Sequence, residues 1–167
     1  MLTEPPNHLA REVSYPNRRG GVQVDCRVLS AHETTDLLSL YSKSGRHSEV
    51  KQSDRLFGAF RGTELVAGLR LDAESGALVL RGMHVAKDLQ GRGLGSQLLR
   101  LVVENIPHDE ACWCLAYPHL QTFYGAHDFR IPAHGDRLPA FLGRRLQAYK
   151  DADLDVLALV RPPQRGA

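Results

Sequence analysis

The stretch that decides the fold lies in the middle of the chain and reads Met83-His84-Val85-Ala86-Lys87-Asp88-Leu89-Gln90-Gly91-Arg92-Gly93-Leu94-Gly95-Ser96. An apolar strand ends at Val85, a polar loop follows, and a glycine-rich turn opens a helix with apolar residues at helical spacing. Glycines let backbone amides approach an oxygen atom, and a helix N-terminus adds unpaired N–H groups and the positive end of its dipole. The stretch therefore predicts a site for a phosphate or pyrophosphate.

Two common phosphate-binding motifs do not match this stretch. A P-loop requires Gly-Lys, and this pair occurs nowhere in the chain. Gly91 and Gly93 match the first two glycines of the dinucleotide fingerprint, but its third position is Ser96. Trp113 also stands near the offset where that fingerprint needs an acidic residue, and a five-residue loop separates the strand from the turn. Both motifs are therefore disfavoured.

The segments on either side predict a fold of the α/β class, α+β type: a mixed, mostly antiparallel central sheet flanked by helices. A capping box, Ser30 to Glu33, predicts a helix with Leu37, Leu38 and Tyr41 on one face and a stop at Gly45. Three apolar runs joined by short turns predict an antiparallel meander. The expected strands are 22–28, 56–61, 65–71, 77–85, 111–116 and 154–160, and the remaining helices are 94–106, 119–126 and 138–149.

The composition indicates an ordinary globular protein with one core. The chain has 167 residues, 43% of them hydrophobic, and a formal net charge of +2 from scattered charges. We therefore expect neither a nucleic acid nor a membrane as partner. We also expect a cytoplasmic location, because the opening residues lack the pattern of a signal peptide. The expected organisation is a mobile leader over residues 1–20, one domain over 21–161 and a tail over 162–167.

The three cysteines do not form a pattern typical of a metal site or a disulfide framework. Cys26, Cys112 and Cys114 are odd in number and contain no CxxC pair. Cys112 and Cys114 lie two residues apart on an expected strand, so they share one face. We interpret all three as small buried apolar residues and expect no bound metal.

Two motifs resemble those of a known enzyme family. Gln90, Gly93 and Gly95 form Gln-x-x-Gly-x-Gly, which resembles the acyl-CoA pyrophosphate loop of the GCN5-related N-acetyltransferases. The segment from Phe123 to Phe129 resembles that family's Tyr-x-x-x-Gly-Phe, although Asp128 replaces the usual glycine. A second departure is Tyr117, where the family often has an asparagine. The order of elements agrees over residues 22–160.

The resemblance implies acetyl-CoA as co-substrate and names the residues that would bind it. The backbone amides near Met83 to Val85 would polarise the acyl carbonyl, and Tyr124 would protonate the leaving thiolate. Packing in the core is the other reading of Tyr124. The implied cofactor-binding residues are Met83, His84, Val85, Gln90, Gly91, Arg92, Gly93, Leu94, Gly95, Ser96 and Tyr124.

The group that removes the proton of the attacking amine stays open. Asp72 and Glu74 belong to the far end of the strand that leads to the loop, some ten residues or ~30 Å from His84. His84 and His119 fall at the correct end, and an imidazole titrates near neutral pH. The candidates for this base are therefore His84, His119 and a relay of water to bulk solvent. We assign His84 as catalytic, together with Tyr124.

These expectations amount to an N-acetyltransferase acting on a primary amine of a small molecule or peptide by direct attack on the thioester. A non-catalytic CoA-binding regulatory module is the alternative, a fold without ligand is a third possibility, and a homodimer is left open. The segment 138–149 carries an apolar stripe that includes Phe141, which either caps the core or walls the acceptor site. Arg144 and Arg145 are expected in solvent.

Overall fold

The computed structural model describes residues 13–14 and 22–166. The expected leader over residues 1–20 lies outside the described residues except for a two-residue strand. Within the described part of the chain, no helix combines the length and the apolar character needed to cross a bilayer.

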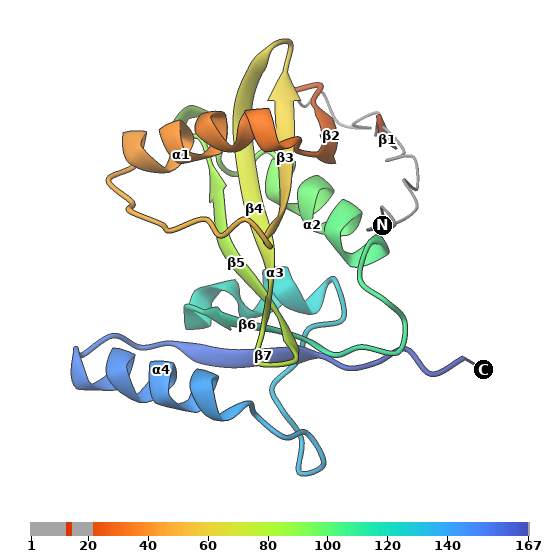
Figure 1. Cartoon of the computed structure of the whole chain (residues 1–167), viewed down its shortest axis with the longest axis vertical. Helices are drawn as coiled ribbons and strands as arrows, with labels where there is room; N and C mark the ends of the chain where they lie inside the picture. Colours follow the sequence, from red (N-terminus) through yellow and green to blue (C-terminus); the bar gives the residue numbers. More distant parts are fainter. Residues whose placement is uncertain (1–12, 15–21, 167) are drawn as a thin grey trace, which may run out of the picture.

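The described residues form one seven-stranded sheet whose strands lie side by side in chain order (Figure 1). Neighbouring strands are antiparallel, except that β5 and β6 run parallel because α2 connects them. The expected mixed and mostly antiparallel sheet is confirmed. The strands are β1 (Val13–Ser14), β2 (Asp25–Val28), β3 (Arg55–Arg61), β4 (Glu64–Glu74), β5 (Ala77–Val85), β6 (Cys112–Ala116) and β7 (Leu157–Arg161).

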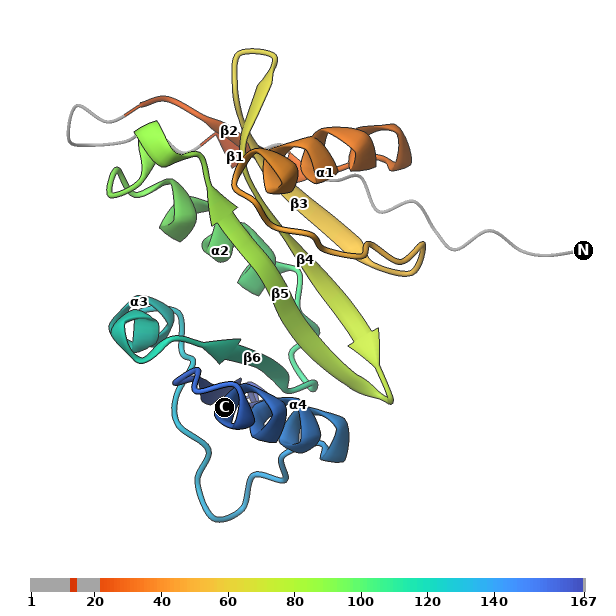
Figure 2. The ribbon, with the colours of Figure 1, turned by 90° about the vertical axis from the view of Figure 1, so that its left-hand side faces the viewer.

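Helices cover both faces of the sheet (Figure 2). On one face, α2 (Leu94–Glu104) packs in the main core, and α3 (Gln121–Gly125) adds Tyr124 to the same core. On the other face, α1 (Thr34–Lys43) packs over the first strands, and α4 (Ala140–Asp151) covers β6 and β7 through Leu142. The alternation of side chains along β4 and β5 therefore decides which residues face which pair of helices.

The entry to α1 matches the expected capping box, but its buried face differs from the expectation. The backbone N–H of Ser30 donates to the Glu33 carboxylate at 2.8 Å, and Gly45 ends the helix with φ +73°. Leu37, Leu40 and Tyr41 are buried, whereas Leu38 is 40% exposed. The prediction for Leu38 was wrong because the chain presents the i, i+3, i+4 stripe from Leu37 to β4, which turns Leu38 toward solvent.

Two irregularities of β5 create space for a site. The register with β4 shifts between Gly68 and Arg70, and Gly82 in the bulge has φ +65°. On its other edge β5 pairs with β6 only from Leu78 to Leu80. The two strands then separate, which leaves residues 81–85 of β5 without a strand partner on that side.

The prediction that the three cysteines are small buried residues is confirmed. Cys26, Cys112 and Cys114 are free and buried, and burial raises the pKa of the Cys26 thiol to about 11 and that of Cys112 to about 12. Such thiols are protonated at neutral pH and behave as apolar side chains.

Candidate active site

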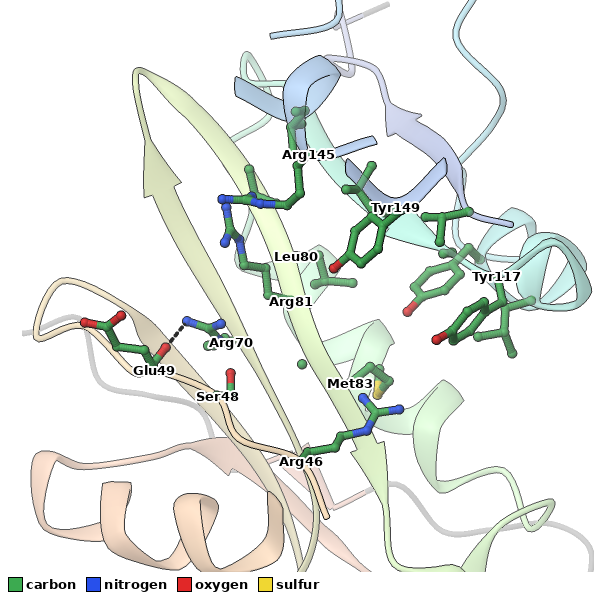
Figure 3. Close-up of a pocket in the computed structure, with 18 of the residues that line it drawn as sticks. Arg46, Ser48, Glu49, Arg70, Leu80, Arg81, Met83, Tyr117, Arg145 and Tyr149 are labelled. Atoms are coloured by element: carbon green, nitrogen blue, oxygen red, sulfur yellow. Dashed lines mark hydrogen bonds between the residues drawn. The ribbon is translucent and has the colours of Figure 1, made fainter. Parts of the chain in front are cut away.

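A cavity of about 510 Å³ lies where β5 and β6 separate. Its floor is formed by residues 79–83 of β5 and residues 115–117 at the end of β6. The loop after α1, residues 46–49, forms one wall, and α4 forms the other with Leu142, Arg145 and Tyr149 (Figure 3). The cavity is large enough for a small ligand and is lined by segments that lie far apart in the chain.

Tyr124 lines the cavity from α3, at the end of the opening between the two strands. Its ring packs edge-on against Phe123 and Phe129, with centroids 5.0 Å and 5.8 Å away, and the residue is 5% exposed. Burial raises the pKa of the Tyr124 phenol above its ordinary range. The phenol therefore stays protonated at neutral pH and can donate a proton into the cavity.

The glycine-rich turn lies between the end of β5 and the first turn of α2. Gly91 and Gly93 have φ +75° and +80°, a backbone conformation that residues with a Cβ rarely adopt. The Gln90 amide donates to the Val85 carbonyl at 3.0 Å and ties the loop back to β5. Among the described residues, no atom lies within 4 Å of where a Cβ of Gly91 or Gly93 would be, so the space beside this turn is open.

This turn fits the pyrophosphate of a nucleotide cofactor. The first backbone N–H groups of α2 have no acceptor within the helix, so an anion of matching size can accept hydrogen bonds from them. Gly95 lies against Phe123: a Cβ at this position would be in van der Waals contact with the ring, at 3.4 Å, so α2 and α3 pack closely here. The turn does not belong to the cavity lining, so an extended cofactor would have to reach from the turn to the cavity.

Two members of the expected binding set also have structural roles. Leu94 is buried in the core under α2, so only its backbone can face a ligand. The Ser96 hydroxyl hydrogen-bonds to Nε2 of His127 at 3.0 Å, which links α2 to the end of α3. Arg92 is exposed beside the turn.

The histidines expected as bases do not line the cavity. His84 is half-buried on β5, opposite Gly68 in the register, and His119 is exposed and stacks on the ring of Tyr117. Burial and the nearby Arg46 lower the pKa of His84 below its ordinary value, so its imidazole is neutral at pH 7. The histidine that does line the cavity is His47, in the loop after α1. Sequence patterns gave no signal for it, because that loop has no periodicity.

The structure corrects the expectation for Arg145 and refines that for α4. Arg145 is half-buried, lies 3.5 Å from the Glu74 carboxylate and lines the cavity, whereas Arg144 is exposed as expected. The helix both packs on β6 and β7, where Leu142 and Phe141 contribute, and walls the cavity, which it does through Leu142, Arg145 and Tyr149 rather than Phe141. The Phe141 ring instead packs beneath the Arg145 guanidinium, 5.7 Å from its centroid.

The described residues contain no group of three or more histidine, cysteine or acidic side chains arranged to bind a metal ion. The polar groups of the cavity are arginines, tyrosines, a histidine, a serine and a glutamate.

Comparison with known proteins identifies the domain. The family model for the acetyltransferase (GNAT) domain matches residues 27–134. A search of curated protein sequences gives no significant match.

Solved structures share the fold at low sequence identity. Escherichia coli ElaA superposes with a TM-score of 0.59 at 19% identity, covering 83% of this chain and 99% of that chain. Arabidopsis thaliana Naa50, in complex with the bisubstrate analogue CoA-Ac-MVNAL, gives 0.57 at 15% identity, covering 82% of this chain and 97% of that chain. N-acetylglutamate synthase from Neisseria gonorrhoeae, complexed with coenzyme A and N-acetyl-glutamate, gives 0.60 at 16% identity, covering 85% of this chain and 35% of that chain.

Proposed function

Since the chain belongs to the GCN5-related N-acetyltransferase (GNAT) family, we propose that it transfers an acetyl group from acetyl-CoA to a primary amine of a small molecule or peptide. The observation that carries the proposal is the separation of β5 from β6 beyond Leu80, beside a cavity that Tyr124 lines, on the strand that leads to the glycine-rich turn. The neighbours solved with CoA or a CoA-based analogue support the use of this co-substrate.

The chain offers separate groups for the two ends of acetyl-CoA. The turn from Gln90 to Ser96, with Arg92 beside it, would hold the pyrophosphate through backbone amides. The backbone of β5 from Met83 to Val85, which lacks a strand partner on the β6 side, would place N–H groups at the thioester carbonyl. His84 contributes through its backbone in this set, independently of its imidazole.

Tyr124 is proposed as the general acid. The neutral amine nitrogen attacks the thioester carbonyl carbon, a C–N bond forms, and the C–S bond breaks. The electron pair of that bond leaves on sulfur, and the Tyr124 hydroxyl donates its proton there. A buried phenol is suited to this role because it remains protonated until the thiolate forms.

The proton of the amine is proposed to pass to the neutral imidazole of His84. Because His84 lies outside the cavity lining, the transfer requires an intervening water molecule. Two alternative proton acceptors are His119 and a chain of water molecules that leads to bulk solvent. His47 is an additional acceptor on the cavity wall.

The first test compares Tyr124→Phe with the native chain. With an active amine, we expect kcat to fall about 10²-fold, the lower range for removing a general acid, while the Kd of CoA changes less than twofold. Tyr41→Phe controls for the loss of a buried phenolic oxygen: its hydroxyl lies against the backbone of Gly82 and does not line the cavity, so it should lower kcat much less than Tyr124→Phe. Thiol release from acetyl-CoA gives the rate, and calorimetry gives the affinity.

The same measurements test the alternative function. A non-catalytic CoA-binding module would bind CoA with the same dependence on the turn, yet release no thiol with any amine. An unchanged kcat in Tyr124→Phe would instead keep the transferase and assign Tyr124 to packing.

A further inference from the structure

The cavity wall is unusually rich in arginine. Arg46 comes from the loop after α1, Arg70 from β4, Arg81 from β5 and Arg145 from α4. Among the described residues that line the cavity, Glu49 is the only acid, and Figure 3 shows its carboxylate pointing away from the cavity. Four cations from four segments therefore face one space.

The carboxylates that pair with three of these arginines lie behind them, outside the cavity lining. Arg70 contacts Asp54 at 3.1 Å, Arg81 contacts Asp72 at 3.5 Å and also pairs with Glu74, and Arg145 contacts Glu74 at 3.5 Å. The Asp54 and Asp72 side chains are completely buried, so they cannot move into the cavity. These carboxylates fix the guanidinium groups in place and leave their cavity side positive.

The guanidinium of Arg46 has no carboxylate partner among the described residues. The Arg46 backbone N–H donates to the Tyr41 carbonyl at 3.0 Å, but the guanidinium forms no hydrogen bond or ion pair within the described part of the chain, and in Figure 3 it extends toward Met83. Arg81 and Arg145 lie together on the other side of the cavity, sharing Glu74 (Figure 3). Burial, and after it the positive charge of Arg145, lowers the pKa of Arg81. The Nε of Arg70, a residue 8% exposed, lacks a hydrogen-bond partner among the described residues.

The four cavity arginines are separate from the glycine-rich turn that is proposed to bind the pyrophosphate. The turn from Gln90 to Ser96 leads into α2, on the face of the sheet opposite to α1 and α4, and none of its residues lines the cavity. The arginines face the side from which the acceptor would reach a thioester held at β5.

We propose that the acceptor is an amine that carries carboxylate groups, with one carboxylate bound by Arg46 and a second by Arg81 and Arg145. This inference rests on the proposed acetyl transfer and specifies its substrate class. The guanidinium fork matches a carboxylate in two parallel hydrogen bonds, and Tyr149 directs its hydroxyl into the same space (Figure 3). The positive wall disfavours polyamines and lysine-like side chains, and it lowers the pKa of an amine bound there, so a larger fraction is neutral and able to attack.

The test compares acceptors that differ by one charge. L-aspartate and L-glutamate are compared with L-asparagine, L-glutamine and 1,5-diaminopentane, and a tetrapeptide beginning with glutamate is compared with one beginning with glutamine. We expect kcat/KM to be at least tenfold higher for the acid of each pair. Preference for the free amino acid or for the peptide identifies the source of the carboxylates, and either supports the proposal.

The variants Arg46→Met and Arg145→Met should each lower kcat/KM for the preferred acid at least tenfold, mainly through KM, and leave the Kd of CoA unchanged. Arg46→Lys should restore part of the loss, because the charge remains. Arg144→Met is the matched control: it removes the neighbouring exposed arginine of α4, and it should leave both constants as they are. Equal turnover of acid and amide, or faster turnover of 1,5-diaminopentane, would overturn the proposal while keeping the acetyltransferase.

A binding measurement covers the case in which none of these amines is acetylated. Glutarate, a dicarboxylate without an amine, should raise the Tm of the CoA-bound chain by several degrees, and Arg46→Met should abolish the shift. No shift with glutarate overturns the anionic site. Failure of CoA itself to bind would overturn the proposed function instead, and the two failures are therefore distinguishable.

Discussion

A single glycine determines the geometry at the centre of the site. Gly82 lies in the bulge of β5 with φ +65°, and a Cβ built there would overlap the hydroxyl oxygen of Tyr41. The bulge turns the backbone of the following residues away from the regular ladder, which is a frequent use of bulges next to active sites. Neither a side chain nor a regular strand conformation fits at this residue.

The substitution Gly82→Ala should destabilise the chain by about 3 kcal/mol, the sum of a positive φ and overpacking against Tyr41. Gly62→Ala is the matched control, because Gly62 has φ +63° and no described atom within 4 Å of the added Cβ. It should cost about 1 kcal/mol. Urea denaturation measures both values. Equal losses in the two variants would show that Tyr41 moves freely and that the bulge tolerates a side chain.

The pH dependence of the reaction tests His84. A base must be deprotonated, and burial together with Arg46 lowers the pKa of this imidazole from 6.5. If His84 accepts the proton, activity is lost as the pH falls through that lowered pKa. With increasing pH, kcat/KM should therefore rise in the range below 6.5 and reach a plateau before neutrality. This limb should disappear in His84→Gln and persist in His119→Gln. A profile that is identical in His84→Gln and the native chain would favour the water relay.

At the scale of helices and strands, the sequence predicted what is local and missed what is not. The periodicity of α2, the turns of the meander and the capping box at Ser30 depend on residues that are close together in the sequence, and all are present. The bulge at Gly82 depends on contact with Tyr41, some forty residues earlier, and the cavity role of Arg145 depends on Glu74 in another strand. Contacts between distant segments leave no periodic pattern, so His47 and Arg46 could not be predicted.

The turn before α2 yields a prediction on cofactor affinity. Gly93 has φ +80°, and Gly93→Val introduces a β-branched residue that cannot adopt this conformation without strain, so the N–H groups of the turn should lose their alignment. We expect the affinity for CoA to fall at least about tenfold, or ~1.4 kcal/mol, by calorimetry. Gly45→Val is the control, because Gly45 has φ +73° but ends α1 far along the chain from the turn. Unchanged affinity in a folded Gly93→Val protein would refute the assignment of this turn.

At the scale of the whole molecule, the sheet has two parts joined by a short seam. Strands β1 to β5 and strands β6 and β7 pair only through Leu78–Leu80 with Cys112–Cys114. The main core cluster crosses this seam, because it contains residues of α2 and β4 together with residues of β6 and β7. The parallel seam therefore separates enough to form the site while the core beneath it keeps both parts together.

Trp113, the single tryptophan of the chain, reports on the part of the molecule away from the glycine-rich turn. It is buried between β6 and α4 with Val79, Leu142 and Val160. CoA at 100 times its Kd should stabilise the fold by ~2.7 kcal/mol, which is roughly 5–10 °C in Tm for a domain of this size. Because the core crosses the seam, the thermal transition followed by Trp113 fluorescence should shift by the same amount as that followed by circular dichroism. If CoA shifted only the circular dichroism transition, β6, β7 and α4 would be unfolding as a separate unit.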